Sequence, residues 1–340
     1  MEIQKKRQAG IDSNKKFFWA PGMEWVKNGD MLTVDSFNYT GAVAELFPEF
    51  YYKVQKGISL NELVQEFPAV NKEQLEEFTK DLVDKSVLVY SILSPYEVFR
   101  PQTKLFKNEY SEEIFFDAVQ LEKYKKKQLS RVLAATDGKK IKLEQQQEYP
   151  EFIAARRTCR VFDSLRKIPA DTFSNLMSFF RQVTDGDKIR YYYACSGGLY
   201  PIDIYVYVKD GRVEGIKGGL YYYSPVDNSM ILTSSSCVIT DEAHVYTNKD
   251  IFKSSAFSIF FIYNAGVTMP KYGGMAYHYA CIDTGIMVGA LTAVAELNNI
   301  GLCSIGNMNF EKIKKYFRLN ENQVLIHTVE GGLKEKCSNI

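Results

Sequence analysis

The sequence predicts an α+β protein in which a small helical domain precedes a larger domain of mixed strands and helices. Two helix-capping signals lie close together near the N-terminus, and several short runs rich in β-branched and aromatic residues follow residue 200. One long apolar segment spans about residues 276–298. With 340 residues, of which 46% are hydrophobic, the chain can bury one large core or two moderate ones.

The first domain is expected over residues 1–95. Ser59 followed three residues later by Glu62 forms a capping box, and Asn71 repeats the signal, so two helices are predicted to begin at these positions. The run 87–92 has the composition of a strand. Two helices followed by a strand indicate a winged-helix-like domain.

A winged helix often binds DNA, but the second predicted helix carries the wrong charge. Over residues 72–85, five acidic side chains outnumber three lysines, so insertion into the major groove would bring negative charge against the phosphates. The whole chain has a net charge of only +1, which provides no general attraction to nucleic acid or to an anionic membrane. We therefore expect a peptide-docking or scaffolding role for this domain, with no nucleic acid and no membrane as partner.

Residues 96–150 are expected to form a helical linker. The segment is rich in charge, and Leu121, Tyr124 and Leu129 recur among its lysines. Such a helix is either a solvated connection between domains or a surface for an acidic carrier protein.

The larger domain is expected over residues 151–340. Strands are predicted over residues 203–209, 220–223, 258–263 and 323–329. Helices are predicted over residues 171–181 and about 276–298. The long helix contains Asp283 and Glu296, which suit the interior of a protein or an interface better than a membrane span. The polar N-terminus has no apolar signal-peptide core, and the six cysteines form no CxxC pair, so we expect a cytoplasmic protein with reduced thiols.

Three segments of this domain combine glycine, hydroxyl and basic side chains, as a phosphorylated planar cofactor requires. Residues 156–162 (RRTCRVF) offer guanidinium groups and a hydroxyl that can hold a phosphate. Residues 195–201 (CSGGLYP) place adjacent glycines before a strand, where backbone N–H groups can approach a ligand. Residues 301–306 (GLCSIG) follow the long helix. Taken singly, these segments are also compatible with a surface basic cluster, a glycine turn, and a helix C-cap with a loop.

The sequence lacks the motifs of zinc sites, of hydrolases and of common nucleotide-binding folds. Three histidines and six scattered cysteines form no zinc-binding pattern, so no metal site is expected. No histidine stands in a hydrolase motif, and neither a Walker lysine nor a GxGxxG fingerprint is present. His327 alternates with apolar residues in a predicted strand and is expected to be a core histidine.

Six separated segments resemble, in order, the FMN-dependent azoline oxidases of the nitroreductase-like superfamily: RRTCRVF, ACSGGLYPIDIYVYVK, GRVEGIKGGLYYYSP, SSAFSIFFI, PKYGGMAYHY and IGLCSIG. The resemblance covers about residues 95–335. It is strongest to the oxidase domains of nonribosomal peptide synthetases, and the SagB-type oxidases of ribosomal peptides are related. It implies a nitroreductase-like FMN-binding domain with a mixed sheet flanked by helices, which forms a homodimer. A free-standing chain resembles an oxidase acting in trans, as in a bacillamide-type pathway.

The resemblance also implies which residues form the site. The implied FMN-binding residues are Arg156, Thr158, Arg160, Ser196, Gly197, Gly198, Leu199, Cys303, Ser304, Gly306 and Lys334. The first three and Lys334 match positions at the phosphate and ribityl oxygens, residues 196–199 match the loop at the edge of the isoalloxazine ring, and residues 303–306 match a later FMN loop. Lys271 and Tyr272 match the lysine–tyrosine pair associated with activity. Asp283 stands where relatives often have glutamate, and the glutamine common near Gly289 is missing.

The implied reaction is the oxidation of a thiazoline or oxazoline to the thiazole or oxazole. The implied substrate is a peptide intermediate bound to the peptidyl carrier protein of a nonribosomal peptide synthetase module, with oxygen as electron acceptor. Two other enzymatic functions are compatible with the sequence: an NAD(P)H-dependent nitro or quinone reductase and a SagB-type azoline dehydrogenase. A flavin-binding regulatory or peptide-recognition module without turnover is the non-enzymatic alternative.

Overall fold

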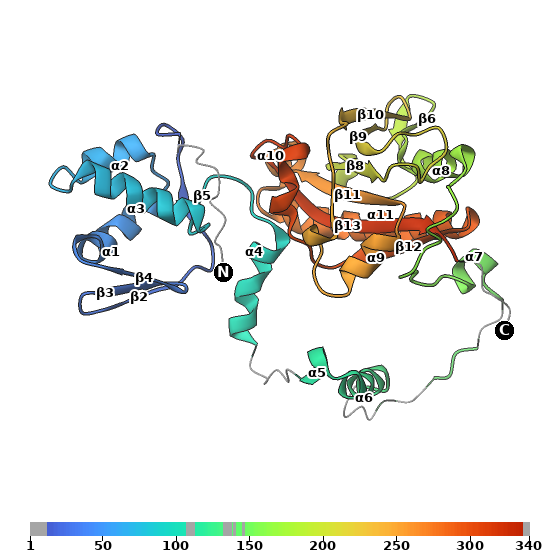
Figure 1. Ribbon diagram of the computed structural model, residues 1–340, viewed down its shortest axis with the longest axis horizontal. Coiled ribbons are helices and arrows are strands. Elements are labelled where there is room, and N and C mark those ends of the chain that lie inside the picture. The colour runs from blue at the N-terminus through green and yellow to red at the C-terminus, as the bar shows by residue number, and fades with distance from the viewer. Residues whose placement is uncertain (1–11, 107–112, 132–137, 139–140, 145–146, 336–340) are drawn as a thin grey trace.

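The described chain packs around separate hydrophobic cores in an N-terminal unit and in a larger C-terminal unit (Figure 1). The computed structural model describes residues 12–106, 113–131, 138, 141–144 and 147–335. Cys337, one of the six cysteines considered above, lies outside these residues, and the other five have free thiols.

The N-terminal unit consists of a three-stranded antiparallel sheet followed by three helices. In chain order these elements are β2 (Trp25–Asn28), β3 (Met31–Val34), β4 (Phe37–Thr40), α1 (Ala42–Val54), α2 (Leu60–Glu66) and α3 (Lys72–Asp84). The predicted cap at Ser59 is confirmed, because its hydroxyl accepts a hydrogen bond from the N–H of Glu62 at 3.2 Å in a complete capping box. Asn71 caps α3 in the same way, through the N–H of Gln74 at 3.1 Å.

The strand expected over residues 87–92 is shorter than predicted. β5 covers only Leu88–Val89, where it pairs with β1 (Phe18–Trp19). Beyond it, the N–H of Ile92 donates to the carbonyl of Glu321 at 3.0 Å. The second half of the expected strand therefore lies against the larger unit.

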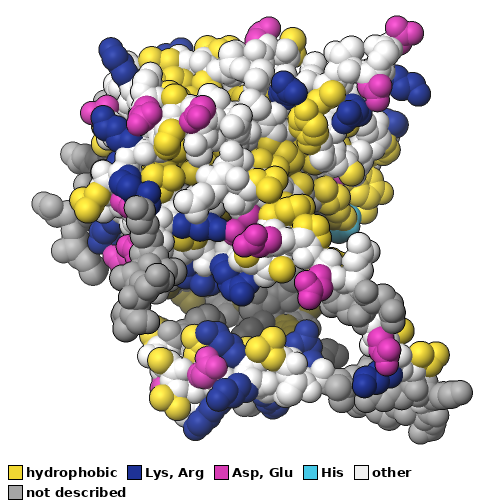
Figure 2. Space-filling model, turned by 90° about the vertical axis from the view of Figure 1, so that its right-hand side faces the viewer, with side chains coloured by type: hydrophobic (Ala, Val, Ile, Leu, Met, Phe, Trp, Pro, Cys, Tyr) yellow, Lys and Arg dark blue, Asp and Glu magenta, His cyan; other side chains and the backbone are white. Residues whose placement is uncertain are grey.

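The described part of the connection between the units contains several short helices, and most of its residues after α4 are exposed. Its elements are α4 (Pro95–Phe99), a 3₁₀ helix (Arg100–Leu105), α5 (Glu113–Phe116), α6 (Ala118–Leu129) and α7 (Glu151–Ala154). α6 buries none of its residues, and Figure 2 shows basic side chains grouped on this lower part of the molecule. The described part of α6 is thus exposed to solvent, as both interpretations of this segment require.

A six-stranded antiparallel sheet forms the centre of the larger unit. Its strands, in spatial order, are β10 (Ser229–Ser234), β9 (Gly219–Ser224), β8 (Ile202–Val208), β11 (Phe257–Asn264), β13 (Gln323–Leu333) and β12 (Ile300–Ile305). The four predicted strands correspond to β8, β9, β11 and β13. The GLCSIG segment, expected to be a loop, is instead mostly β12, because residues 300–305 pair with residues 328–333 of β13.

Helices cover both faces of this sheet. α8 (Ala170–Met177) and α11 (Met275–Leu297) pack on the face that carries Ile259 and Phe261 of β11. α9 (Asn248–Ser254) and the 3₁₀ turns of residues 310–316 pack on the opposite face, with Phe260 and Ile262. α10 (Ala265–Tyr272) connects β11 to α11, and the hairpin of β6 (Val183–Asp185) and β7 (Lys188–Arg190) lies outside the main sheet.

α11 is long and apolar enough to cross a membrane by length and composition, and it is the one such helix in the described ranges. One face of the helix, including Ala280, Met287 and Leu291, is buried in the core of the larger unit. Its carboxylate Asp283 is only 3% exposed and accepts hydrogen bonds from a neighbouring loop. These contacts are those of a core helix, as the sequence predicts.

Candidate active site

The predicted phosphate-binding residues lie in an extended segment after α7, beside β12. The N–H of Cys159 donates to the carbonyl of Leu302 at 3.0 Å, and an alanine Cβ at Gly301 would lie 2.6 Å from the Cys159 side chain. Glycine at this position therefore lets the segment lie flat against the strand. The side chains of Arg156, Thr158 and Arg160 are all exposed there, so two guanidinium groups and a hydroxyl are available to an anion.

Lys334 and Cys303 lie near these arginines but are less available to a ligand. Lys334 forms an ion pair with Glu296 of α11, whose side chain is only 8% exposed, so part of its charge is already neutralised. The Cys303 side chain is buried with Phe162 and Ile251, and this burial raises the pKa of its thiol, an effect that the nearby Arg160 opposes. Only the backbone of Cys303 can meet a cofactor.

Ser304 and Gly306 complete the later segment at the end of β12. Both residues are exposed, whereas Cys303 and Ile305 on either side of Ser304 are buried. The alternation of the strand therefore turns Ser304 outward. Gly306 lies where the chain leaves the sheet.

The predicted ring-edge loop is anchored by Asp283. Both carboxylate oxygens of Asp283 accept a hydrogen bond from the Ser196 N–H, at 3.0 and 3.1 Å. The carboxylate also accepts hydrogen bonds from the Ser196 hydroxyl at 2.9 Å and from the Cys195 thiol at 3.2 Å. Burial, together with the charge and hydrogen bond of Asp283, raises the pKa of Cys195 to about 12. Sequence reasoning singled out Asp283 only as a departure from related proteins and missed its role as the anchor of this loop.

Lys271 and Tyr272, the predicted catalytic pair, lie at the end of α10 against the same loop. A Cβ atom on Gly197 would overlap the Tyr272 hydroxyl oxygen and would lie 3.3 Å from the Lys271 Nζ. The Lys271 Nζ is 4.9 Å from the centre of the Tyr272 ring. The fold therefore brings together two sets of residues that are more than seventy positions apart in the sequence.

The ring-edge loop and the arginine segment do not meet within one chain. The loop is bound to Asp283, whereas Lys334, beside the arginine segment, pairs with Glu296; at 1.5 Å per residue these two carboxylates are roughly 20 Å apart along α11. The outward face of the helix on either side of Asp283 carries Ile282 and Ile286, which are 47% and 41% exposed. The predicted site residues thus form two separate clusters, the ring-edge loop and the arginine segment, and α11 has exposed apolar residues on its outward face.

The sequence profile of the nitroreductase family matches residues 153–332, just over half of the chain. The chain therefore belongs to the nitroreductase family, and its fold is that of a nitroreductase-like oxidoreductase. No curated protein sequence matches it.

Several solved structures are similar to this chain at low sequence identity. A chain of the Escherichia coli microcin synthetase McbBCD complex, with truncated pro-MccB17 bound, is 16% identical with a TM-score of 0.55, and the match covers 80% of this chain and 98% of that chain. An oxidoreductase containing FMN is 13% identical with a TM-score of 0.40, covering 58% and 82%. A nitroreductase family protein from Clostridium novyi NT is 16% identical with a TM-score of 0.38, covering 56% and 87%.

Proposed function

We propose that this protein is an FMN-dependent oxidase that dehydrogenates a thiazoline or oxazoline to the aromatic azole. The observation that carries the proposal is the contact of Lys271 and Tyr272 with the Gly197 loop. The resemblance assigns the pair to catalysis and the loop to the flavin ring. Their contact supports the proposal, because it places the predicted base beside the predicted ring-edge loop.

The exposed side chains fit an FMN cofactor. Arg156 and Arg160 can each make charge-assisted hydrogen bonds to a phosphate, and Thr158 adds a hydroxyl donor. Gly197 and Gly198 both have a φ of +66°, and without a Cβ they leave the backbone of their loop open to a flat ring. When bound, FMN supplies the two-electron acceptor of the reaction.

We propose a homodimer, because one chain holds the two clusters, which we call half-sites, far apart. A second copy packed on the exposed face of α11, with the two helices antiparallel, would bring the arginine segment of one subunit to the Gly197 loop of the other. Small and apolar residues on that face, including Gly285, Ile286 and Gly289, suit close helix packing. The dimer then contains two equivalent FMN sites.

The proposed chemistry removes a proton and a hydride from neighbouring ring carbons of the azoline. The carbon between the C=N bond and the exocyclic carbonyl is acidic, because its anion delocalises onto both groups. Tyr272 or Lys271 takes this proton, and the Lys271 ammonium lies close enough to stabilise negative charge on the phenol oxygen. The carbon beside sulfur or oxygen gives up the hydride, and the aromatic product forms. Molecular oxygen finally accepts the two electrons and two protons as hydrogen peroxide.

The proposed substrate is a peptide held on a larger carrier. A peptidyl carrier protein of a nonribosomal peptide synthetase is the carrier that the sequence resemblance favours. A ribosomal peptide is the second candidate, because the match to a chain of the McbBCD complex extends over most of the present chain. In either case we place the reaction in the cytoplasm, where the free thiols stay reduced.

Mass spectrometry of a thiazolinyl-loaded carrier protein incubated with this chain tests the proposal. We expect the loss of two hydrogens, and we expect Lys271→Ala and Tyr272→Phe to slow it by about a hundredfold while FMN content is retained. Tyr279→Phe is the matched control, because its ring lies 5.6 Å from that of Tyr272 and has no assigned role. Rapid NAD(P)H oxidation without azoline oxidation would identify a reductase instead.

A further inference from the structure

β13 extends beyond the neighbouring strand at the edge of the sheet. β12 pairs with β13 only over residues 328–333, whereas β11 pairs with its other edge as far as Gln323. Residues 323–327 of β13 therefore have one strand edge with no strand partner in the described part of the chain. A longer β12 would occupy this edge, but the chain turns away after Ile305.

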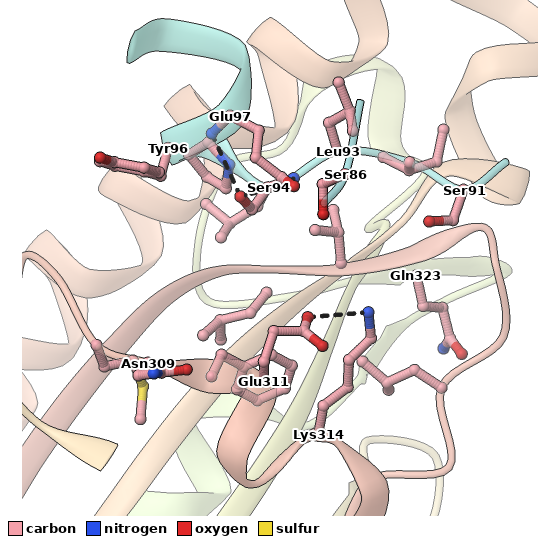
Figure 3. Close-up of a pocket in the computed structure, with 18 of the residues that line it drawn as sticks. Ser86, Ser91, Leu93, Ser94, Tyr96, Glu97, Asn309, Glu311, Lys314 and Gln323 are labelled. Atoms are coloured by element: carbon pink, nitrogen blue, oxygen red, sulfur yellow. Dashed lines mark hydrogen bonds and ion pairs between the residues drawn. The ribbon is translucent and has the colours of Figure 1, made fainter. Parts of the chain in front are cut away.

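A groove of about 690 Å³ follows the open edge (Figure 3). The connection over residues 88–97 lies along one side of β13, and the segment 307–314 lies along the other. The connection is fixed in place, because the Tyr277 hydroxyl donates to the carbonyl of Leu93 at 2.8 Å and the N–H of Ile92 donates to the carbonyl of Glu321. The open edge of β13 therefore lies in the groove between residues 88–97 and residues 307–314.

The charged side chains of the groove have ion-pair or hydrogen-bond partners within the chain. Glu311 and Lys314 form an ion pair at 3.2 Å, and Glu97 accepts hydrogen bonds within the capping box of Ser94. Burial lowers the pKa of His327, so its ring is neutral at pH 7. The groove therefore favours an uncharged occupant.

The remaining lining combines polar and apolar side chains. Ser91, Asn309 and Gln323 supply hydroxyl and amide groups, and Leu93 and Leu325 supply apolar contacts. Such a surface can accept small side chains of either kind.

We propose that this groove binds the peptide that flanks the azoline, in an extended conformation, as an added strand on the open edge of β13. A free strand edge presents N–H and C=O groups at strand spacing, and an extended polypeptide is the ligand that matches them. About five residues in this conformation would span roughly 16 Å, the length of the open edge.

The substrate assignment of the groove rests on the proposed function. The groove reaches Ile305, Gly306 and Asn307, and Gly306 belongs to the segment assigned to the cofactor. A peptide strand on β13 would therefore lead its azoline end toward the flavin. The strand would supply affinity, and the pockets beside it would accept small uncharged side chains.

A backbone methylation scan tests strand addition directly. The probe is a fluorescein-labelled hexapeptide of serine, valine and threonine, and its binding is followed by fluorescence anisotropy with the intact FMN-loaded protein. In a strand, alternate amides face the sheet, so N-methylation at every second position should weaken binding by about tenfold, whereas methylation between them should change it less than twofold. No binding at millimolar peptide, or no alternation, would overturn the proposal.

Amide hydrogen exchange and a groove variant locate the binding. The peptide should slow exchange over residues 323–327, and Ser91→Trp should abolish this protection while Ser91→Ala retains it. Protection that persists in Ser91→Trp, or that rises with protein concentration in the absence of peptide, would overturn the proposal, because the peptide would then lie elsewhere or a second copy would fill the groove. Oxidation of a small free thiazoline, which needs no peptide groove, tests the proposed function separately.

Discussion

Replacing Gly197 with alanine tests whether the position of the Tyr272 hydroxyl controls turnover. The added Cβ would overlap the hydroxyl oxygen and would lie 3.1 Å from the Tyr272 Cζ and 3.3 Å from the Lys271 Nζ. Gly197 has a φ of +66°, where alanine costs about 1–2 kcal/mol relative to its preferred conformations. The substitution therefore adds a moderate backbone cost and forces the Tyr272 side chain away from the loop.

Gly198→Ala is a matched control for this experiment. Gly198 also has a φ of +66°, but a Cβ there would have no atom within 4 Å. The two variants share the backbone cost and an added methyl group on the predicted ring-edge loop, and they differ in the displacement of Tyr272. Their difference in turnover therefore measures the effect of that displacement.

We expect Gly197→Ala to oxidise thiazoline about a hundredfold more slowly than Gly198→Ala, because a misplacement of about 1 Å in a catalytic group has this effect. The assay is the rate of two-hydrogen loss by mass spectrometry, with FMN content and urea unfolding measured in parallel. FMN content should agree between the variants. Equal turnover of the two variants would refute a role for the Tyr272 hydroxyl at its observed position.

Two further predictions concern the half-sites. Arg160→Ala should weaken FMN binding by roughly tenfold to a hundredfold or more, because a charge-assisted hydrogen bond contributes about 1.5–3 kcal/mol; an unchanged dissociation constant in a flavin titration would remove this residue from the phosphate site. Asp283→Asn should lower the pKa of Cys195 from its value of about 12, because the amide removes a negative charge while burial remains. Alkylation of Cys195 by iodoacetamide should then begin at lower pH than in the parent, and an unshifted pH profile would contradict the anchoring role of Asp283.

The elements that the sequence predicts well are those determined by local patterns. The caps at Ser59 and Asn71 follow from side chains three residues apart, and β8 and β11 follow from continuous runs of apolar residues. The sheet β2–β4 was not predicted, because its strands are only four residues long and, of their residues, only Leu32 and Val34 are buried. β12 was expected to be a loop, since its strand character comes from pairing with β13 and not from its own glycine-containing sequence.

The residue types of the candidate site could be inferred from the resemblance, but their division into two half-sites could not. The resemblance assigns Arg160 and Gly197 to one cofactor, yet the Gly197 loop is bound to Asp283, whereas Lys334, beside the arginine segment, pairs with Glu296 further along α11. That separation depends on how β12 and α10 pack, which is a non-local property of the fold. The exposed face of α11 is the feature that gives this separation a functional meaning, since a second copy would join the half-sites.

Asp283 shows how a departure from the pattern of related proteins is accommodated. An aspartate is one methylene shorter than the glutamate that the sequence resemblance leads us to expect at this position, so its carboxylate can bind the loop only if the loop lies close to α11. The hydrogen bonds to Ser196 show that it does, and the absence of a Cβ at Gly197 leaves room for the Tyr272 hydroxyl on the loop. The short acid and the glycine therefore act together, because lengthening the first or enlarging the second would separate the predicted ring-edge loop from the predicted catalytic pair.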